Sequence, residues 1–134
     1  MRGTIFMGLV MVAGALLACR AKLNGSINVD GTTFKPAACR SGEANMPRFS
    51  GVDFTNSSGR RLRFIALQNG SLRTFLFEPG SKTGTLVGQG CGTINVTEQN
   101  STVNDVKNVQ GTLSADCTGS GHHVTATMNF KNCH

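Results

Sequence analysis

Residues 60–78 read RRLRFIALQNGSLRTFLFE and carry the clearest structural signal in the chain. Two mostly apolar segments flank Asn69-Gly70, which is the strongest short-range signal for a β-hairpin because both residues tolerate the positive φ of a two-residue turn. A two-residue loop predicts one apolar face at the centre of the core, formed by the cross-strand pairs Phe64–Phe75 and Leu62–Phe77 together with Ala66.

Strand signals recur along the rest of the chain at intervals typical of β-sandwiches and barrels. Asp30-Gly31 separates two strand segments within residues 26–34 and predicts a second tight hairpin. The last segment alternates cleanly and predicts four inward-facing side chains, Val124, Ala126, Met128 and Phe130. Further strands are expected at 93–97, 103–109 and 112–117, and loops at 35–47 and 79–90. We therefore expect an all-β fold, an antiparallel β-sandwich or partly closed barrel of about seven to nine short strands.

Composition and length exclude several other classes of protein. Charged residues make up 15% of the chain, well below the usual quarter, and 17 of its 134 residues are glycine. Low charge and abundant glycine argue against a coiled coil and against an acidic disordered chain. The length leaves room for one domain with one core.

The amino-terminal segment has the pattern of an export signal. Residues 1–18 carry a single charge, Arg2, followed by an apolar run from Ile5 to Ala18. This run is too short to span a bilayer comfortably as a permanent helix, and its place after a basic residue is typical of a signal peptide. The segment is therefore not expected to belong to the fold.

The end of this segment, Leu16-Leu17-Ala18-Cys19, resembles the lipobox of bacterial lipoproteins, in which a leucine precedes two small or apolar residues and a cysteine. The resemblance implies cleavage before Cys19 and acylation of both its thiol and its new amino group, which provides the several acyl chains that stable anchoring needs. The residue after the cysteine is Arg20 and not the aspartate that keeps such lipoproteins in the inner membrane. In a Gram-negative host, the resemblance therefore implies the outer membrane. The alternative is ordinary cleavage nearby, for example after Ala21, which discards Cys19.

This interpretation divides the chain into three parts: a lipoprotein signal peptide over 1–18, a lipidated anchor and short tether over 19–24, and a single β domain over 25–134. The domain resembles small exported lipoproteins built as disulfide-stapled β-sandwiches. The expected location is the cell envelope, with the protein attached to the membrane through its N-terminal lipid.

Four cysteines remain after Cys19, and an even number in an exported domain predicts two disulfides among Cys39, Cys91, Cys117 and Cys133. Zinc is the competing use of four thiols, but no pair has the close spacing of structural zinc sites. Three histidines are expected to be solvated rather than metal ligands: His122, His123 and His134. We expect no metal and no cofactor.

Strand geometry restricts how these cysteines pair. Cys117 and Cys133 would be separated by roughly ten residues of a returning strand, on the order of 30 Å, which exceeds the reach of a disulfide. Cys117 shares the core-facing parity of its strand, whereas Cys133 does not. The pattern therefore favours Cys39–Cys117 with Cys91–Cys133, and Cys39–Cys133 with Cys91–Cys117 stays open.

Arginines concentrate in the hairpin at 60–78, where the sequence places Arg60, Arg61, Arg63 and Arg73. In a chain of net charge +6, this cluster is a candidate site for an anionic lipid, an acidic glycan or an envelope protein. The alternative is a solvated edge that prevents sheets from pairing. The same register places Arg61 opposite Glu78. Nucleic acid is not an expected partner, because the chain has no Trp or Tyr on which bases could stack.

The sequence contains no recognisable catalytic motif, neither a G-x-S-x-G elbow, nor a Walker loop, nor H-E-x-x-H. Ser120 and His122 are close in sequence but lie in a glycine-rich turn without the geometry of a triad. We therefore expect a non-enzymatic cell-envelope lipoprotein, a structural or binding module. One alternative is an envelope inhibitor similar to the lipoprotein inhibitors of lysozyme, but lysozymes are typically basic and this chain is basic too. A small hydrolase is the third hypothesis.

Overall fold

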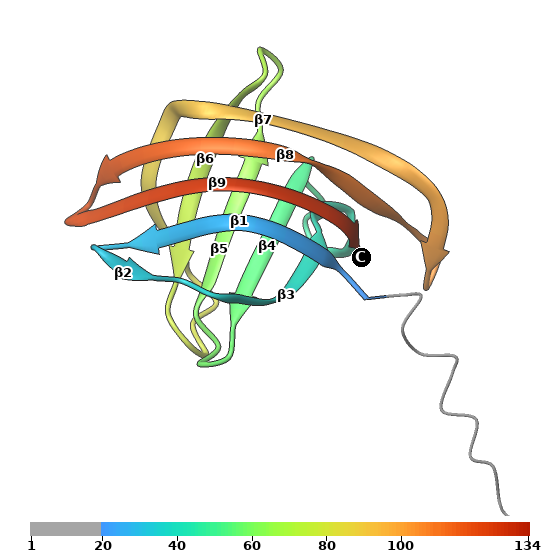
Figure 1. The fold of residues 1–134 in the computed structure, drawn as a ribbon, viewed down its shortest axis with the longest axis horizontal. Helices are drawn as coiled ribbons and strands as arrows, with labels where there is room; N and C mark the ends of the chain where they lie inside the picture. The colour runs from blue at the N-terminus through green and yellow to red at the C-terminus, as the bar shows by residue number, and fades with distance from the viewer. Residues whose placement is uncertain (1–19) are drawn as a thin grey trace, which may run out of the picture.

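The computed structural model describes residues 20–134, so the expected signal peptide and Cys19 lie outside the described residues. All the strands of this part belong to one antiparallel sheet of nine strands, in the order β2-β1-β9-β8-β7-β6-β5-β4-β3 (Figure 1). The bounds are β1 Lys22–Val29, β2 Thr32–Thr33, β3 Pro36–Ser41, β4 Gly51–Asn56, β5 Arg61–Ala66, β6 Ser71–Phe77, β7 Thr85–Val103, β8 Val106–Gly119 and β9 His122–Cys133, with a short 3-10 helix at Gly42–Ala44. The predicted all-β class is confirmed.

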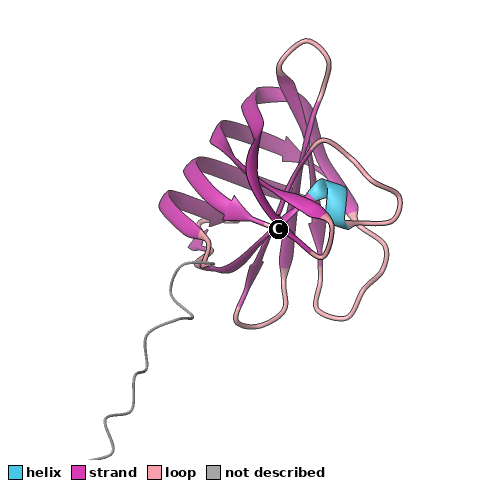
Figure 2. Cartoon of the chain, turned by 90° about the vertical axis from the view of Figure 1, so that its right-hand side faces the viewer, coloured by secondary structure: helices cyan, strands magenta, loops and turns pink. Residues whose placement is uncertain are grey.

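The sheet curls on itself as a partly closed barrel (Figures 1 and 2). Its two halves face each other across one core, because the ring of Phe54 on β4 lies 5.9 Å from that of Phe130 on β9 and 6.0 Å from that of Phe64 on β5. Such edge-on aromatic pairs add about 0.5–1.5 kcal/mol each beyond the area that they bury. The four side chains predicted to face inward from the last strand are all buried here: Val124, Ala126, Met128 and Phe130.

The hairpin at 60–78 forms, but with a register that differs from the predicted one. Its loop has three residues, because the amide of Leu67 donates to the carbonyl of Ser71 over 2.9 Å, and Gly70 adopts a φ of 82°. This is a type of hairpin loop with a left-handed residue at its last position. Ala66 consequently faces Leu72, one residue away from the expected pairing.

A shift of one residue moves a strand's whole apolar set to the other face of the sheet. The predicted pairs Phe64–Phe75 and Leu62–Phe77 are therefore wrong. Phe64 pairs with Thr74 and stays in the core. Phe75 and Phe77 instead share the outer face of the sheet with the arginines.

The disulfides are Cys39–Cys133, which links β3 to β9 with the Cα atoms 5.0 Å apart, and Cys91–Cys117, which links β7 to β8. Two disulfides are confirmed, but the favoured pairing was wrong. Its premise fails at Asn132, which has a φ of 58° and breaks the alternation of β9. Cys133 is consequently turned inward and fully buried, where it reaches Cys39.

Four segment expectations are also corrected. The expected loop at 35–47 contains β3, and β7 begins at Thr85 inside the expected loop at 79–90. The expected strand at 103–109 is interrupted by Asn104 and Asp105, which both have positive φ and form the tight turn between β7 and β8. Part of the expected tether, residues 22–24, belongs to β1. Over residues 20–134, no helix has the length and apolar character needed to cross a membrane.

Candidate binding site

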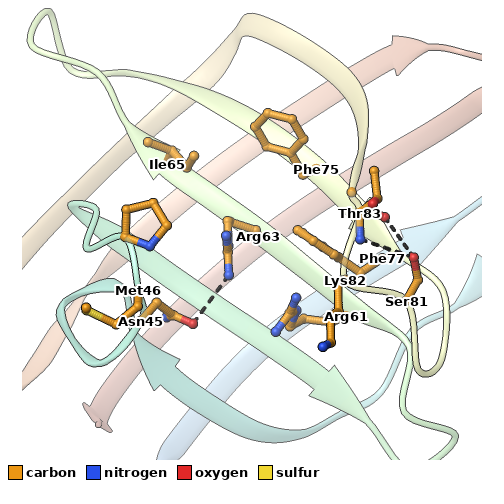
Figure 3. A pocket seen from close by; sticks show the side chains of 12 residues that line it. Asn45, Met46, Arg61, Arg63, Ile65, Phe75, Phe77, Ser81, Lys82 and Thr83 are labelled. Atoms are coloured by element: carbon orange, nitrogen blue, oxygen red, sulfur yellow. Dashed lines mark hydrogen bonds between the residues drawn. The ribbon is translucent and has the colours of Figure 1, made fainter.

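A cavity of about 700 Å³ lies on the outer face of β5 and β6 (Figure 3). Its volume is within the usual range of small-molecule sites, about 300–1,000 Å³. The floor consists of outward-facing side chains of the two strands, and the walls are residues 45–47 and 81–84. Segments that are far apart in sequence therefore build this site.

The floor combines positive charge with apolar surface. Alternation along β5 places Arg61, Arg63 and Ile65 on the outer face, opposite the buried Leu62 and Phe64. The register of the hairpin adds Phe75 and Phe77 from β6, with Arg63 paired to Phe75 and Arg61 to Phe77. The shifted register is therefore what gives the cavity its aromatic lining.

The wall at 81–84 is held tightly against Phe77. A Cβ atom on Gly84 would come within 2.6 Å of the Phe77 ring, so only glycine allows this approach. Within the loop, the Ser81 hydroxyl donates to the carbonyl of Thr83 over 3.0 Å. These contacts leave Phe77 only 7% exposed and place Lys82 beside the arginines.

The wall at 45–47 follows the short 3-10 helix. Asn45 is fixed by two hydrogen bonds, from its backbone amide to the carbonyl of Gly42 and from its side-chain amide to the carbonyl of Ser41. The next residue, Met46, is 91% exposed at the rim of the cavity. An apolar side chain so fully open to solvent is available to cover a bound molecule.

Arg63 is already engaged by the protein. Its guanidinium donates two hydrogen bonds to the carboxylate of Asp53, over 2.8 and 3.0 Å, and a longer one of 3.4 Å to Asn45. It also lies 4.5 Å from the centre of the Phe49 ring. Asp53 is 1% exposed, so this bidentate pair neutralises a buried carboxylate. Arg63 therefore contributes shape to the cavity but little uncompensated charge.

Arg61 has a different environment. Its guanidinium carbon lies 4.1 Å from the centre of the Phe77 ring, and its Nε atom is buried without a hydrogen-bond partner. Neither Arg61 nor Lys82 makes an ion pair with any residue in 20–134. A buried donor without a partner costs roughly 1–3 kcal/mol, so the placement of this side chain lowers the stability of the fold. The cavity thus holds positive charge that no described residue balances.

The structure brings together two of the four predicted arginines. Arg60 does not line the cavity and forms an ion pair with Glu78 over 3.0 Å, so the expected pairing of Glu78 with Arg61 is corrected. Arg73 does not line it either and donates to the side chain of Gln89. Of the arginines that the sequence grouped together, two therefore line the cavity, and the other two are bound to side chains outside it.

Sequence reasoning missed most of the lining of the cavity. Phe75 and Phe77 were assigned to the core through the wrong register. Met46 and Lys82 lie in expected loops, where no periodicity indicates what a side chain faces. The one available signal is that the loop with Lys82 directly follows the hairpin in sequence, and none exists for Met46.

A second polar cluster lies at the turns between β1 and β2 and between β8 and β9. Nδ1 of His122 and the backbone amide of His123 donate to the Asp30 carboxylate over 2.7 and 2.8 Å. The first of these hydrogen bonds and then the second lower the pKa of Asp30 below its ordinary value of 3.8. Ser120 donates to the carbonyl of Leu86, not to a histidine. Within residues 20–134 no group of three potential metal ligands comes together.

Comparison with known proteins gives no relative for this chain. No protein-family model matches it, and neither the curated proteins nor the solved structures contain a match.

Proposed function

We propose that the chain is a non-enzymatic lipoprotein of the cell envelope that works as a binding module for an anionic partner. In this proposal, the protein is exported and attached to the membrane by acyl chains on Cys19, at the outer membrane if the host is Gram-negative. The outer face of β5 and β6 holds the partner.

The proposed location is supported by the cysteines. Two disulfides are typical of an oxidising, exported environment and rare in the cytosol. The proposed anchor is supported by the resemblance of Leu16-Leu17-Ala18-Cys19 to a lipobox.

One observation carries the binding role: Arg61 lines the cavity as a half-buried guanidinium that forms no ion pair and no hydrogen bond with any described residue. Lys82 adds a second positive charge with no ion pair in the described part of the chain. An anionic group would satisfy both.

Membrane fractionation of the host tests the anchor. The wild-type protein is expected in the membrane fraction, and Cys19→Ser in the soluble fraction. Globomycin, which blocks lipoprotein signal peptidase, is expected to cause the precursor to accumulate. A Cys19→Ser protein that stays with the membrane, or a precursor that does not accumulate, would overturn the anchor.

Binding of anions tests the module. The processed chain carrying Cys19→Ser is titrated with three anionic probes, polygalacturonate, phosphatidylglycerol vesicles and decanoate, each beside a neutral counterpart. At least one anion should bind more tightly than its counterpart, and Arg61→Gln should weaken that binding. Arg73→Gln is the matched control, because it removes the same charge from the neighbouring strand outside the cavity. If no anion is preferred, the binding role is wrong.

A further inference from the structure

We infer that the ligand of this cavity is a single-chain anionic amphiphile, held as a monomer with its acidic head at Arg61 and Lys82 and its apolar body along Ile65, Phe75 and Met46. This inference rests on the proposed binding role and names the chemical class of the ligand.

The number of charges at the site favours one anionic group. Of the two cavity arginines, Arg63 already donates to both carboxylate oxygens of Asp53, so only Arg61 has a charge that no described carboxylate balances. A carboxylate, phosphate or sulfonate accepts charge-assisted hydrogen bonds from one guanidinium and attracts the nearby Lys82 ammonium. A polyanion would need more partners than this cavity provides.

The position of these groups favours an elongated ligand with two different ends. Figure 3 shows Arg61 and Lys82 together at one end of the cavity and Ile65 at the other, with Phe75 beside it. Arg61 and Ile65 are four residues apart on β5, which at the strand rise is about 13 Å. A ligand with its head at one end can therefore lay a medium-length chain or a fused ring along the floor.

The lining of the apolar end favours a hydrocarbon over a sugar. Ile65, Phe75 and Pro47 offer no side-chain hydrogen-bond donor or acceptor, and Met46 is an adaptable apolar side chain, 91% exposed at the rim. Covering such surfaces is favourable by about 25 cal/mol for each Å² removed from water. A glycan would leave its hydroxyl groups unsatisfied against this surface.

Calorimetric titration of the processed Cys19→Ser chain separates the two ends of the ligand. Decanoate, kept below its micelle concentration, is expected to bind with a stoichiometry of one. Acetate carries the head without the tail, and decyltrimethylammonium carries the tail with the opposite charge; neither is expected to bind measurably. Equal binding of decanoate and decyltrimethylammonium would overturn the inference.

Two variants locate the head. Losing a hydrogen bond to a charged group costs about 1.5–3 kcal/mol, so Arg61→Gln should weaken decanoate binding by roughly tenfold or more. Lys82→Gln, at an exposed position of its loop, should weaken it by a smaller factor. Arg73→Gln should leave it within about twofold of the wild type, a change worth less than 0.5 kcal/mol. Decanoate binding that survives both cavity substitutions would overturn the inference.

Vesicles distinguish a free amphiphile from a membrane lipid as the source of the same chemistry. A monomer site predicts that decanoate binds without vesicles and that bound decanoate lowers any Arg61-dependent affinity for phosphatidylglycerol vesicles. If vesicles bind in an Arg61-dependent way while decanoate does not bind, the amphiphile inference fails and the broader binding role stands. If no anion binds at all, both fail.

Discussion

The guanidinium carbon of Arg61 lies 4.1 Å from the centre of the Phe77 ring, and the two residues are direct partners across β5 and β6. The contact holds the arginine against the floor of the cavity, with its Nε atom buried and unpartnered. A cation over an aromatic ring gains about 0.5–1 kcal/mol where solvent has access. This gain is smaller than the roughly 1–3 kcal/mol that an unpartnered buried donor costs.

Arg61→Met should therefore stabilise the folded protein while weakening the binding of anions. Methionine keeps an apolar contact with Phe77 and removes the unpartnered donor, so we expect the free energy of unfolding to rise by about 1 kcal/mol. Chemical denaturation of the two proteins measures this difference. A loss of more than about 1 kcal/mol would show that the guanidinium is a structural group.

Arg63 should behave in the opposite way. Arg63→Met leaves the Asp53 carboxylate, 1% exposed, without its partner, and removing one member of a buried ion pair costs about 3–5 kcal/mol. Arg60→Met is the matched control, since its partner Glu78 is 58% exposed and such pairs contribute about 0–1 kcal/mol. Similar effects of the two substitutions on the denaturation midpoint would contradict the assigned roles.

The two disulfides should differ in their contributions to stability. The sequence separations are 94 residues for Cys39–Cys133 and 26 for Cys91–Cys117. Loop-closure entropy predicts losses of about 4.7 and 3.5 kcal/mol when each pair is replaced by alanines. Denaturation of the two double variants tests this order.

Peptide mapping tests the pairing itself. Tryptic digestion without reduction should join residues 23–40 to 132–134 and residues 83–107 to 108–131. A peptide that joins 23–40 to 108–131 would instead support the pairing favoured by the sequence pattern.

Acid should destabilise the protein in part through Asp30. Because the pKa of this carboxyl is lower in the folded protein than its ordinary value of 3.8, the folded state binds fewer protons than the unfolded state. Its contribution is therefore present above that value and is lost as pH falls through the lowered pKa. Asp30→Asn keeps a residue that tolerates the positive φ at this turn, and should flatten the decline of unfolding free energy between about pH 5 and 2. An unchanged acid profile would contradict this.

The fold could be predicted where local pattern and tertiary environment agree. Alternation along the last strand identifies Val124 and Met128 as core residues, and Asp30-Gly31 identifies a hairpin with Val29 opposite Thr32. These features depend on strand period and turn chemistry, which are properties of short segments.

Prediction failed where a single residue changes which face of the sheet the following side chains of a strand occupy. Asn69-Gly70 indicates a turn but does not distinguish a two-residue loop from a three-residue one, and this single difference moved Phe75 and Phe77 from the core to the cavity. Asn132 changes the phase of β9 in the same way and sends Cys133 to Cys39. The cavity also depends on the loops at 45–47 and 81–84. They lie on either side of it only because of how the whole sheet folds, which no short segment of sequence indicates.

The most direct test of the account is the 15N–1H spectrum of the arginine Nε–Hε groups during titration with decanoate. The Arg61 resonance should move and saturate with the ligand, because a carboxylate bound to the accessible nitrogens of this half-buried guanidinium changes the environment of its Nε–Hε group. The resonances of Arg60 and Arg73, which have partners on the protein, should stay in place. Binding that leaves the Arg61 resonance unchanged, or that moves Arg73 instead, would contradict the assignment of this cavity.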